Sequence, residues 1–493
     1  METPDEPARS AGGLILRGVV GSLLVLLGGL VVSPLPRSAR ILDLAWLVDL
    51  RDANPGRYAA TFAVMLGVAL LAHSWLMLCR HVSAVGRATG EAVGLVQRAT
   101  LIWSAPLMLA PPLFSRDGWS YAAQGMMTSV GLSPYDSGPA VLHGPIVETV
   151  DPLWLATPTP YGPLPLIFGD LAARITTDPW ALVMLHRCAA VVGLVLLAWA
   201  VPRMARWSGV NPALSAGIVI ASPLMLTTGV GGLHNDLLMV GLMSAALVVA
   251  AERNWCAAAV LGGLAAAVKV PGGLICIAVA LVSLPVAASL WERVRRLVAV
   301  GAISLATLAG LGLVWGLGIG WLEALTVPGT VNTPLSAATV LGKALDSAAA
   351  AVGLDLAPEL FIGVVRDLAT VATVVVMAWV ALRWRTGDRY DAIRAAVVIV
   401  ATLLLLSPVV HLWYFLWLVP FVAVLRMTRF GIVLLLVLTG LAGLIAPFDP
   451  TMRSLLGTTT IAVGCLALTL LNFLRPGPRE VFVEIAESEE VPA

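Results

Sequence analysis

The chain is poor in charge, because only 12% of its 493 residues are charged, against about 25% in ordinary soluble domains. Its formal net charge is +1 and it has no basic stripe, which excludes nucleic acid as a partner. The five cysteines lie in or beside apolar segments without CxxC spacing, so neither a disulfide framework nor a cysteine metal site is predicted. Phosphate-binding loops, GxSxG elbows and dinucleotide fingerprints are absent as well.

Hydrophobic residues are what the chain has in abundance, at 59% of the sequence and a mean hydropathy of +0.92. Segments of about 20 apolar residues recur along its length, which predicts an all-α polytopic membrane protein with about 13–14 transmembrane helices. Two of the segments are shorter than the roughly 17 residues of a straight crossing, so we expect 255–268 and 412–425 to be tilted, broken or re-entrant. The predicted spans are 14–32, 59–79, 99–113, 180–201, 212–228, 236–251, 255–268, 272–289, 298–319, 362–382, 393–410, 412–425, 430–446 and 455–473.

The arginines predict the orientation, because most of them can be placed on one side together with both termini, as the positive-inside rule favours for the cytoplasm. Four arginines between the first two spans face the other way in this arrangement. We therefore expect a cytoplasmic tail over 1–13, a membrane domain over 14–474 and an acidic cytoplasmic tail over 475–493. The outer face would carry two long loops, at about 114–178 and 320–361, the second with an Ala-rich surface helix.

The first outer loop opens on Arg116-Asp117 after a hydrophobic span. If a helix starts there, Asp117, Ser120 or Tyr121, and Gln124 share one face, which combines a carboxylate base with hydroxyl and amide groups that suit a sugar. Trp119 and Tyr135 in the same loop could supply flat surfaces for the C–H face of a sugar ring. The structural alternative is that Asp117 only caps a surface helix.

Two further polar groups lie at predicted helix ends. His234-Asn235-Asp236 precedes a span, where the three residues could bind sugar hydroxyls or merely cap the helix. Lys269 stands between two apolar stretches just before Pro271-Gly272-Gly273, and a cation at that depth is costly unless it has a function. Together with the following helix start it would suit a polyprenyl phosphate. Its structural alternative is a lysine that snorkels to the interface.

The last cluster is His411-Leu412-Trp413-Tyr414, at an outer break between two spans. The histidine could bind a phosphate or stabilise a leaving group, whereas the aromatic run could also be an interfacial belt. No His, Cys and Asp set has metal-ligand spacing, and no cofactor is predicted from it. Asp117 and Asp236 could nevertheless share a divalent cation if the fold brings them together.

At these residues the sequence resembles the actinobacterial polyprenol-phosphate-mannose-dependent α-1,6-mannopyranosyltransferases, which belong to the GT-C glycosyltransferases. The resemblance covers most of the chain, with one departure: the family usually has HPWY where this chain has His411-Leu412-Trp413-Tyr414. The segments that carry it are SRDGWSYAAQG, GLSPYDSGP, DPLWLATPTPYGPL, HNDLLMVGLM, NTPLS and HLWYFLW.

The resemblance implies a GT-C-type fold and an inverting transfer of mannose at the outer face of the plasma membrane. The donor would be polyprenyl-phosphate-mannose, and the acceptor a lipid-anchored α-1,6-mannan of the lipomannan and lipoarabinomannan type. Asp117 would then be the base that takes the proton of the acceptor 6-hydroxyl. Lys269, His411 and Arg116 would bind the donor phosphate, although Arg116 could instead pair with Asp117. The sugar-binding residues would be Tyr121, Gln124, Tyr161, His234, Asn235, Asp236, Trp413 and Tyr414.

Three alternatives remain open from the sequence. One is a non-catalytic assembly subunit with a vestigial first loop, against which Asp117 argues. A transporter or flippase of a lipid-linked sugar would more often show internal repeats and charges midway through its spans, whereas the candidates here lie at outer span ends. A GT-C transferase of another sugar, such as arabinose, would use the same kinds of hydroxyl-binding residues.

Overall fold

The computed structural model describes residues 6–84 and 90–448, and these residues form helices without any β-strand. Five of the helices are long and apolar enough to cross a membrane, or six if one bent pair is counted as a single span. The chain is therefore an all-α, multi-pass membrane protein, as the sequence predicts. The five long helices are α1 (Glu6–Val32), α3 (Asn54–Ala84), α8 (Pro179–Ser208), α13 (Leu290–Val314) and α16 (Leu360–Arg383).

Helices occupy the predicted spans in order up to residue 446, but several of them are broken or short. Of the 13–14 predicted crossings, the described residues show five or six by length and composition. The predicted span at 212–228 is bent by 55° where Ser222-Pro223 separates its two parts, because proline cannot donate the next helix bond. The predicted break at 412–425 is confirmed, and the span predicted at 455–473 lies outside the described residues. These elements are α4 (Gly90–Met108), α9 (Pro212–Ile220), the π-helix η3 (Met225–Gly231), α10 (Asp236–Glu252), α11 (Trp255–Val268), η4 (Val270–Leu274), α12 (Ile275–Val282), α17 (Arg389–Leu406), η6 (Leu412–Trp417), α18 (Val419–Val422) and α19 (Arg429–Ile445).

Burial divides the helices into an inner and an outer group. Nearly every residue of α9, η3 and the first two thirds of α10 is buried, whereas α13 and α16 leave most of their apolar side chains exposed. A helix that is hydrophobic all round and buried belongs to the core, and exposed apolar helices are suited to face lipid. Helix α10 therefore occupies the centre, packed against α8 and α11.

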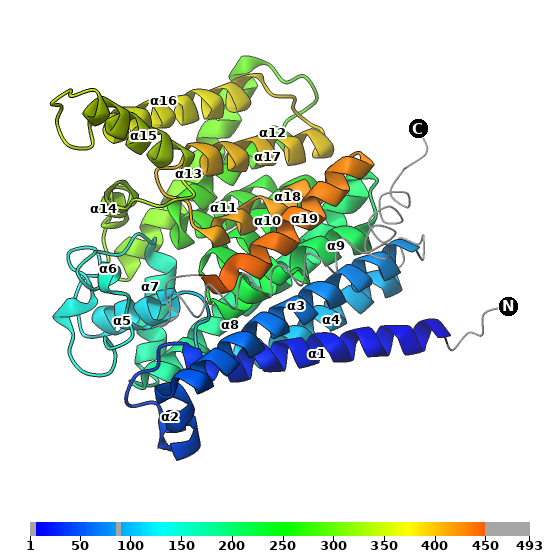
Figure 1. Cartoon of the computed structure of the whole chain (residues 1–493). Helices are drawn as coiled ribbons and strands as arrows, with labels where there is room; N and C mark the ends of the chain where they lie inside the picture. The colour runs from blue at the N-terminus through cyan, green and yellow to red at the C-terminus, as the bar shows by residue number, and fades with distance from the viewer. Residues whose placement is uncertain (1–5, 85–89, 449–493) are drawn as a thin grey trace.

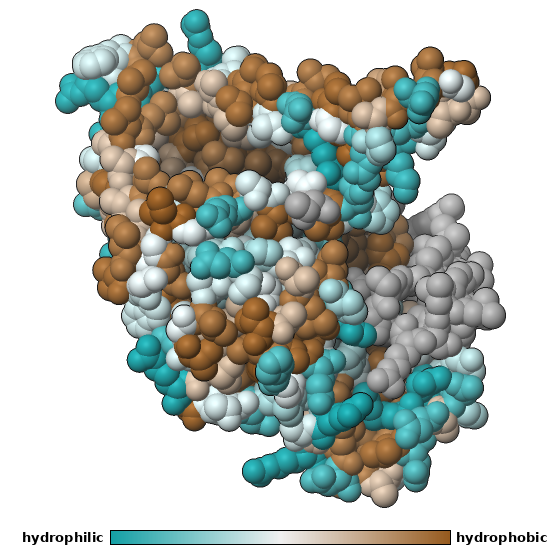
Figure 2. All heavy atoms as spheres, turned by 90° about the vertical axis from the view of Figure 1, so that its left-hand side faces the viewer, coloured by the Kyte–Doolittle hydropathy of each residue, from teal (hydrophilic) through white to brown (hydrophobic). Residues whose placement is uncertain are grey.

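Short helices gather at one end of the bundle, at the left in Figure 1. All of them except α2 come from the two long loops that the sequence predicts, and the predicted Ala-rich helix is α15. Figure 2 views this end and shows a hollow with a hydrophobic upper rim, where α15 and α16 lie, above a more polar region. The short helices are α2 (Ala45–Asp52), α5 (Asp117–Ser129), α6 (Pro152–Leu155), α7 (Pro163–Ala173), α14 (Trp321–Ala324) and α15 (Ala337–Ala351).

Candidate active site

Asp117 begins helix α5, as the sequence predicts. Arg116 is the N-cap and makes no side-chain capping bond, while the Asp117 backbone N–H donates to Ser115 Oγ at 3.1 Å. The Asp117 carboxylate accepts no hydrogen bond from an N–H group of its helix, so the interpretation of this residue as a simple cap is wrong. Its side chain is 12% exposed, which leaves the carboxylate buried but reachable.

A chain of hydroxyl groups leads to this carboxylate. Tyr121 OH lies 3.4 Å from Asp117 Oδ2 and 2.9 Å from Tyr161 OH. An ionised carboxylate only accepts hydrogen bonds, so Tyr121 donates to Asp117 and Tyr161 donates to Tyr121. Burial raises the pKa of both phenols well above the ordinary value, and both therefore stay protonated donors.

Gln124 lies one turn further along the same face of α5, also as predicted. Thr159 Oγ1 donates to Gln124 Oε1 at 3.1 Å, and the Tyr161 backbone N–H donates to Thr159 Oγ1 at 3.4 Å. In this arrangement Gln124 fixes the loop segment that presents Tyr161. Thr159 was not among the predicted site residues, and only its place in the TPTPYG segment pointed to it.

His234 faces Asp117 from the start of α10. Its Nδ1 lies 2.6 Å from the Thr228 carbonyl oxygen, and its Nε2 lies 4.0 Å from Asp117 Oδ2. Burial lowers the pKa of the imidazole, so it is neutral near pH 7 with its proton on Nδ1. Nε2 is buried without a hydrogen-bond partner and remains an acceptor. The 4.0 Å gap is too long for a hydrogen bond.

Asp236 and Lys269 form a buried ion pair across the α10–α11 hairpin. Lys269 Nζ lies 3.1 Å from Asp236 Oδ1, to which Trp417 Nε1 also donates at 2.7 Å. Asp236 is fully buried and accepts no capping bond, and Lys269 is only 7% exposed. Helix capping does not explain Asp236, and the alternative that Lys269 snorkels to the interface is wrong, because the lysine is buried and its charge is neutralised by Asp236.

Aromatic rings surround the ion pair. Lys269 Nζ lies 4.1 Å from the centroid of the Tyr414 ring, 5.1 Å from that of Trp417 and 5.5 Å from that of Tyr161. The negative faces of such rings attract a cation. Trp417 was missed by the sequence analysis, although it belongs to the same HLWYFLW run as Trp413 and Tyr414.

Three flat rings stack at the edge of the cluster. Trp413 lies between His234, at 3.9 Å between ring centroids, and His411, at 4.4 Å. Burial and then the Lys269 charge lower the pKa of His411 to about 4, so its imidazole is neutral near pH 7. The fold therefore brings the His411–Tyr414 cluster to His234, which faces Asp117. In this position His411 is a neutral hydrogen-bonding group and not a cation.

Several buried polar atoms of the cluster have no partner in the structure, including Trp413 Nε1, Asn235 Nδ2 and Asp236 Oδ2. Asn235 is the N-cap of α10 but makes no side-chain capping bond. An unpartnered buried polar group costs about 1–3 kcal/mol. Their concentration around Asp117 and His234 is typical of a site that binds a polar ligand.

The structure places three other candidates differently. Arg116 forms no ion pair with Asp117, whose carboxylate faces His234 instead. Trp119 is 1% exposed and packs against Trp180 with ring centroids 6.5 Å apart, and Tyr135 is buried against Gly320. The expectation that Trp119 and Tyr135 offer open surfaces to a sugar is therefore wrong.

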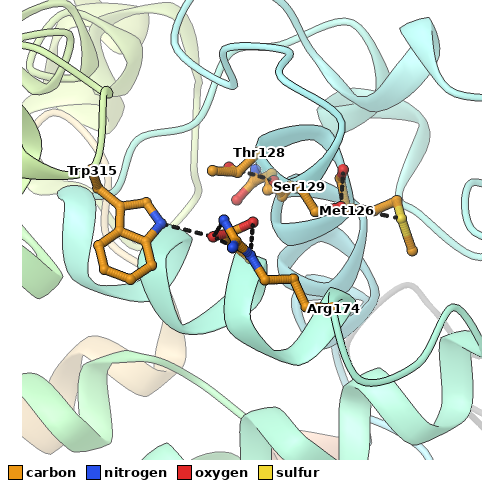
Figure 3. A network of polar contacts seen from close by, with 7 residues as sticks. Met126, Thr128, Ser129, Arg174 and Trp315 are labelled. Atoms are coloured by element: carbon orange, nitrogen blue, oxygen red, sulfur yellow. Dashed lines mark hydrogen bonds and ion pairs between the residues drawn. The ribbon is translucent and has the colours of Figure 1, made fainter.

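A polar network braces the loop helices that carry the site. Trp315 Nε1 donates to the buried Asp170 carboxylate at 2.8 Å, and Arg174 pairs with the same group at 2.9 Å. Figure 3 shows Trp315 and Arg174 on either side of the carboxylate they share. The network links α7, which packs on α5, to the end of α13. None of these residues was predicted from the sequence.

The fold brings both Asp117 and Asp236 to one site, as a shared cation would require. In the described part of the chain, however, no group of three or more His, Cys, Asp and Glu side chains has a metal-binding arrangement. Asp236 is also neutralised by Lys269. These residues therefore do not fit a resident metal.

Comparison with known proteins gives a consistent picture. Residues 15–285 match the profile described as "Alpha-(1->6)-mannopyranosyltransferase, N-terminal domain", and residues 338–475 match the "MptB C-terminal domain". The chain is 32% identical to alpha-(1->6)-mannopyranosyltransferase A of Mycobacterium tuberculosis, over 85% of this chain and 81% of that protein. It is 27% identical to alpha-(1->6)-mannopyranosyltransferase B of Corynebacterium glutamicum, over 84% and 73% of the two chains.

Proposed function

Because the chain belongs to the alpha-(1->6)-mannopyranosyltransferase family, we propose that it transfers mannose to the 6-hydroxyl of an α-1,6-mannan acceptor. The donor in this proposal is polyprenyl-phosphate-mannose, and the reaction takes place on the extracytoplasmic side of the plasma membrane. The observation that carries the proposal is the meeting of Asp117, His234 and the Asp236–Lys269 pair in one buried, polar site.

We assign the role of general base to Asp117. The acceptor oxygen attacks the anomeric carbon, its proton passes to Asp117, and the polyprenyl phosphate leaves with the electrons of the broken C–O bond. The configuration inverts because attack and departure occur on opposite faces of the sugar. A phosphate is a good leaving group and needs no acid, which agrees with a site that holds a single reachable carboxylate base.

Three features suit Asp117 to this role. Burial raises the pKa of its carboxyl, which makes it a stronger base than a solvated aspartate. Tyr121 donates to Oδ2 and fixes the orientation of the carboxylate. His234 Nε2 accepts, so an acceptor hydroxyl between Asp117 and His234 could direct its proton to the carboxylate while other sugar hydroxyls bind the imidazole.

The donor phosphate would bind beside Lys269. Its ammonium group has three hydrogens, and Asp236 engages one of them, so a phosphate oxygen can take another. Because Asp236 already neutralises much of the charge, the phosphate also needs neutral hydrogen-bond donors. Trp413 Nε1 and Asn235 Nδ2 are buried and unpartnered, and His411 adds an imidazole at the end of the ring stack.

A lipid-borne donor suits the surroundings of the site. The hollow in Figure 2 has a hydrophobic upper rim. Helix α15, on the same side of the molecule, exposes the apolar side chains of Val340, Leu341 and Leu345. An isoprenoid chain is favoured on apolar surface that is shielded from water. A transporter would instead place its charged groups at the midplane, whereas Asp117 and Lys269 lie at helix ends.

The test is mannose transfer in proteoliposomes, from radiolabelled polyprenyl-phosphate-mannose to a short α-1,6-mannoside. Asp117→Asn should lower kcat by about 100-fold to 10,000-fold, the usual contribution of a general base. Asp151→Asn is the matched control, because Asp151 lies in the same loop and only caps α6 through Leu153 N–H. Near wild-type transfer by Asp117→Asn would refute the assignment of the base.

The stereochemistry has its own measurement. Digestion of the product with a linkage-specific α-mannosidase, together with the anomeric NMR coupling, would show whether an α-1,6 bond forms from a β-linked donor. A β-linked product would contradict inversion. Wild-type protein that moves the labelled lipid across the bilayer without transferring mannose would support the transporter alternative.

A further inference from the structure

Arg187 on α8 is completely buried and has no carboxylate partner among the residues that the structure describes. Its guanidinium instead donates to four backbone carbonyl oxygens. Nη1 lies 2.8 Å from Leu107 O and 2.6 Å from Val230 O. Nη2 lies 2.6 Å from Ala110 O and 3.3 Å from Gly231 O.

These carbonyls belong to two segments that are far apart in the sequence. Leu107 lies in the last turn of α4 and Ala110 two residues beyond its end, and Val230 and Gly231 lie at the end of η3. The last carbonyls of a helix have no partner within it and carry partial negative charge, so a buried cation between two such ends is stabilised by both. The planar guanidinium can address both ends at once, which a lysine ammonium cannot.

Both segments lead directly into the candidate active site. The first continues through Pro111 and Pro112 to Asp117, and the second continues to His234 and Asp236. Two contacts that do not involve Arg187 also join these two segments. The Leu113 backbone N–H donates to Gly231 O at 3.0 Å, and a side chain at Gly118 would collide with Pro112 and Leu233.

The same two segments carry unfavourable backbone conformations. Phe114 has φ +61° and Leu233 has φ +56°, in the left-handed region that residues with large side chains avoid. Such conformations persist only where the surrounding structure enforces them, and they are common at functional sites. Phe114 lies three positions before Asp117, and Leu233 lies directly before His234. In each segment the strained residue lies between the carbonyl groups that Arg187 binds and the residue of the site.

We propose that Arg187 is a positioning residue for this site, whose guanidinium holds the two segments together and so sets the placement of Asp117 relative to His234. The inference rests on the proposed function for its catalytic readout. The base and the acceptor hydroxyl must meet at hydrogen-bond distance, and a misplacement of 1 Å can cost about 100-fold in rate. Arg187 touches no substrate in this proposal and acts only through the backbone.

The test compares Arg187→Lys and Arg187→Met with wild type in the mannose-transfer assay, with rates normalised to folded protein. We expect kcat to fall on the order of 100-fold for Arg187→Met, because the loss of geometry affects the reacting groups. The KM for the donor should change by less than about threefold, since Lys269, the cation of the proposed phosphate site, follows α11 and lies outside both segments. Arg187→Lys should recover part of kcat, because an ammonium can still bind some of the carbonyls.

Arg293→Lys is the matched control. Arg293 is also a buried arginine on a long helix, and it donates to two backbone carbonyls, those of Ala288 and Trp384, away from the site. Its substitution should lower the yield of folded protein and leave kcat per folded molecule near wild type. An equal loss of kcat in both lysine variants, or kcat within threefold of wild type for Arg187→Met, would overturn the proposal.

Hydrogen exchange separates this proposal from the proposed function. In Arg187→Lys we expect faster exchange in residues 107–118 and 228–237, and in Arg293→Lys we expect both stretches to remain as in wild type. If wild-type protein transfers no mannose while the exchange pattern is as expected, the proposed function fails. The proposal that Arg187 holds the two segments together is then still supported. Unchanged exchange in both stretches of Arg187→Lys would refute the positioning role of Arg187, whatever the rate of mannose transfer.

Discussion

The buried pair of Asp236 and Lys269 offers a sharp energetic test. Lys269→Met would leave the Asp236 carboxylate in the interior with only Trp417 Nε1 as a partner at Oδ1. Removing one member of a buried ion pair costs about 3–5 kcal/mol, because the remaining charge has lost its water and its counterion. We expect a loss of this size in the free energy of unfolding for Lys269→Met, and a similar loss for Asp236→Asn.

The double variant Lys269→Met/Asp236→Asn should be far more stable than the sum of the two losses predicts. With both charges removed, no unpaired charge stays buried, and a coupling energy of up to about 3 kcal/mol is expected for residues in direct contact. This variant should nevertheless transfer no mannose, because the ammonium that binds the phosphate in our proposal is gone. Recovered stability with absent activity would separate the structural role of Lys269 from its role in the reaction.

The assay is equilibrium unfolding in detergent micelles, followed by tryptophan fluorescence. Arg394→Gln is the matched control, since Arg394 pairs with Asp391 at 3.0 Å but is 48% exposed. The loss of such a pair should cost less than about 1 kcal/mol. Additive losses in the double variant, or a cost for Lys269→Met as small as the control, would refute the buried ion pair.

Two further predictions concern the base and the packing beneath it. Transfer should be lost as pH falls through the raised pKa of Asp117, because only the ionised carboxylate accepts a proton; a pH–rate profile of kcat measures this. Tyr121→Phe removes a donor to the charged form and should move that acid limb to higher pH, and an unmoved limb would contradict the contact. Gly125→Ala should cost about 1–3 kcal/mol in thermal unfolding, because its new Cβ would lie 2.6 Å from the Gly169 backbone. Gly301→Ala has open space and should be neutral or slightly stabilising; equal effects of the two would argue against a tight α5–α7 contact.

The sequence was sufficient to predict several residues of the candidate site and their positions relative to helix ends. Asp117 at a helix start, Tyr121 and Gln124 on the same face, and Lys269 before a glycine turn all follow from local pattern, and the structure confirms these placements. Local pattern could not distinguish a cap from a functional carboxylate, because both lie at a helix start. The capping alternative failed only when the hydrogen bonds of Asp117 were known.

Hydropathy alone determined that the chain is an all-α membrane protein, because ~20 apolar residues have few other stable environments. Only the tertiary structure decided that Lys269 pairs with Asp236, that Trp413 lies between two histidines, and that Arg187 joins the ends of α4 and η3. Apart from the stacking of Trp413 on His411, these contacts join residues between 33 and 179 positions apart in the chain. Such distances depend on how whole helices pack, and local periodicity reports only the neighbours within one or two turns.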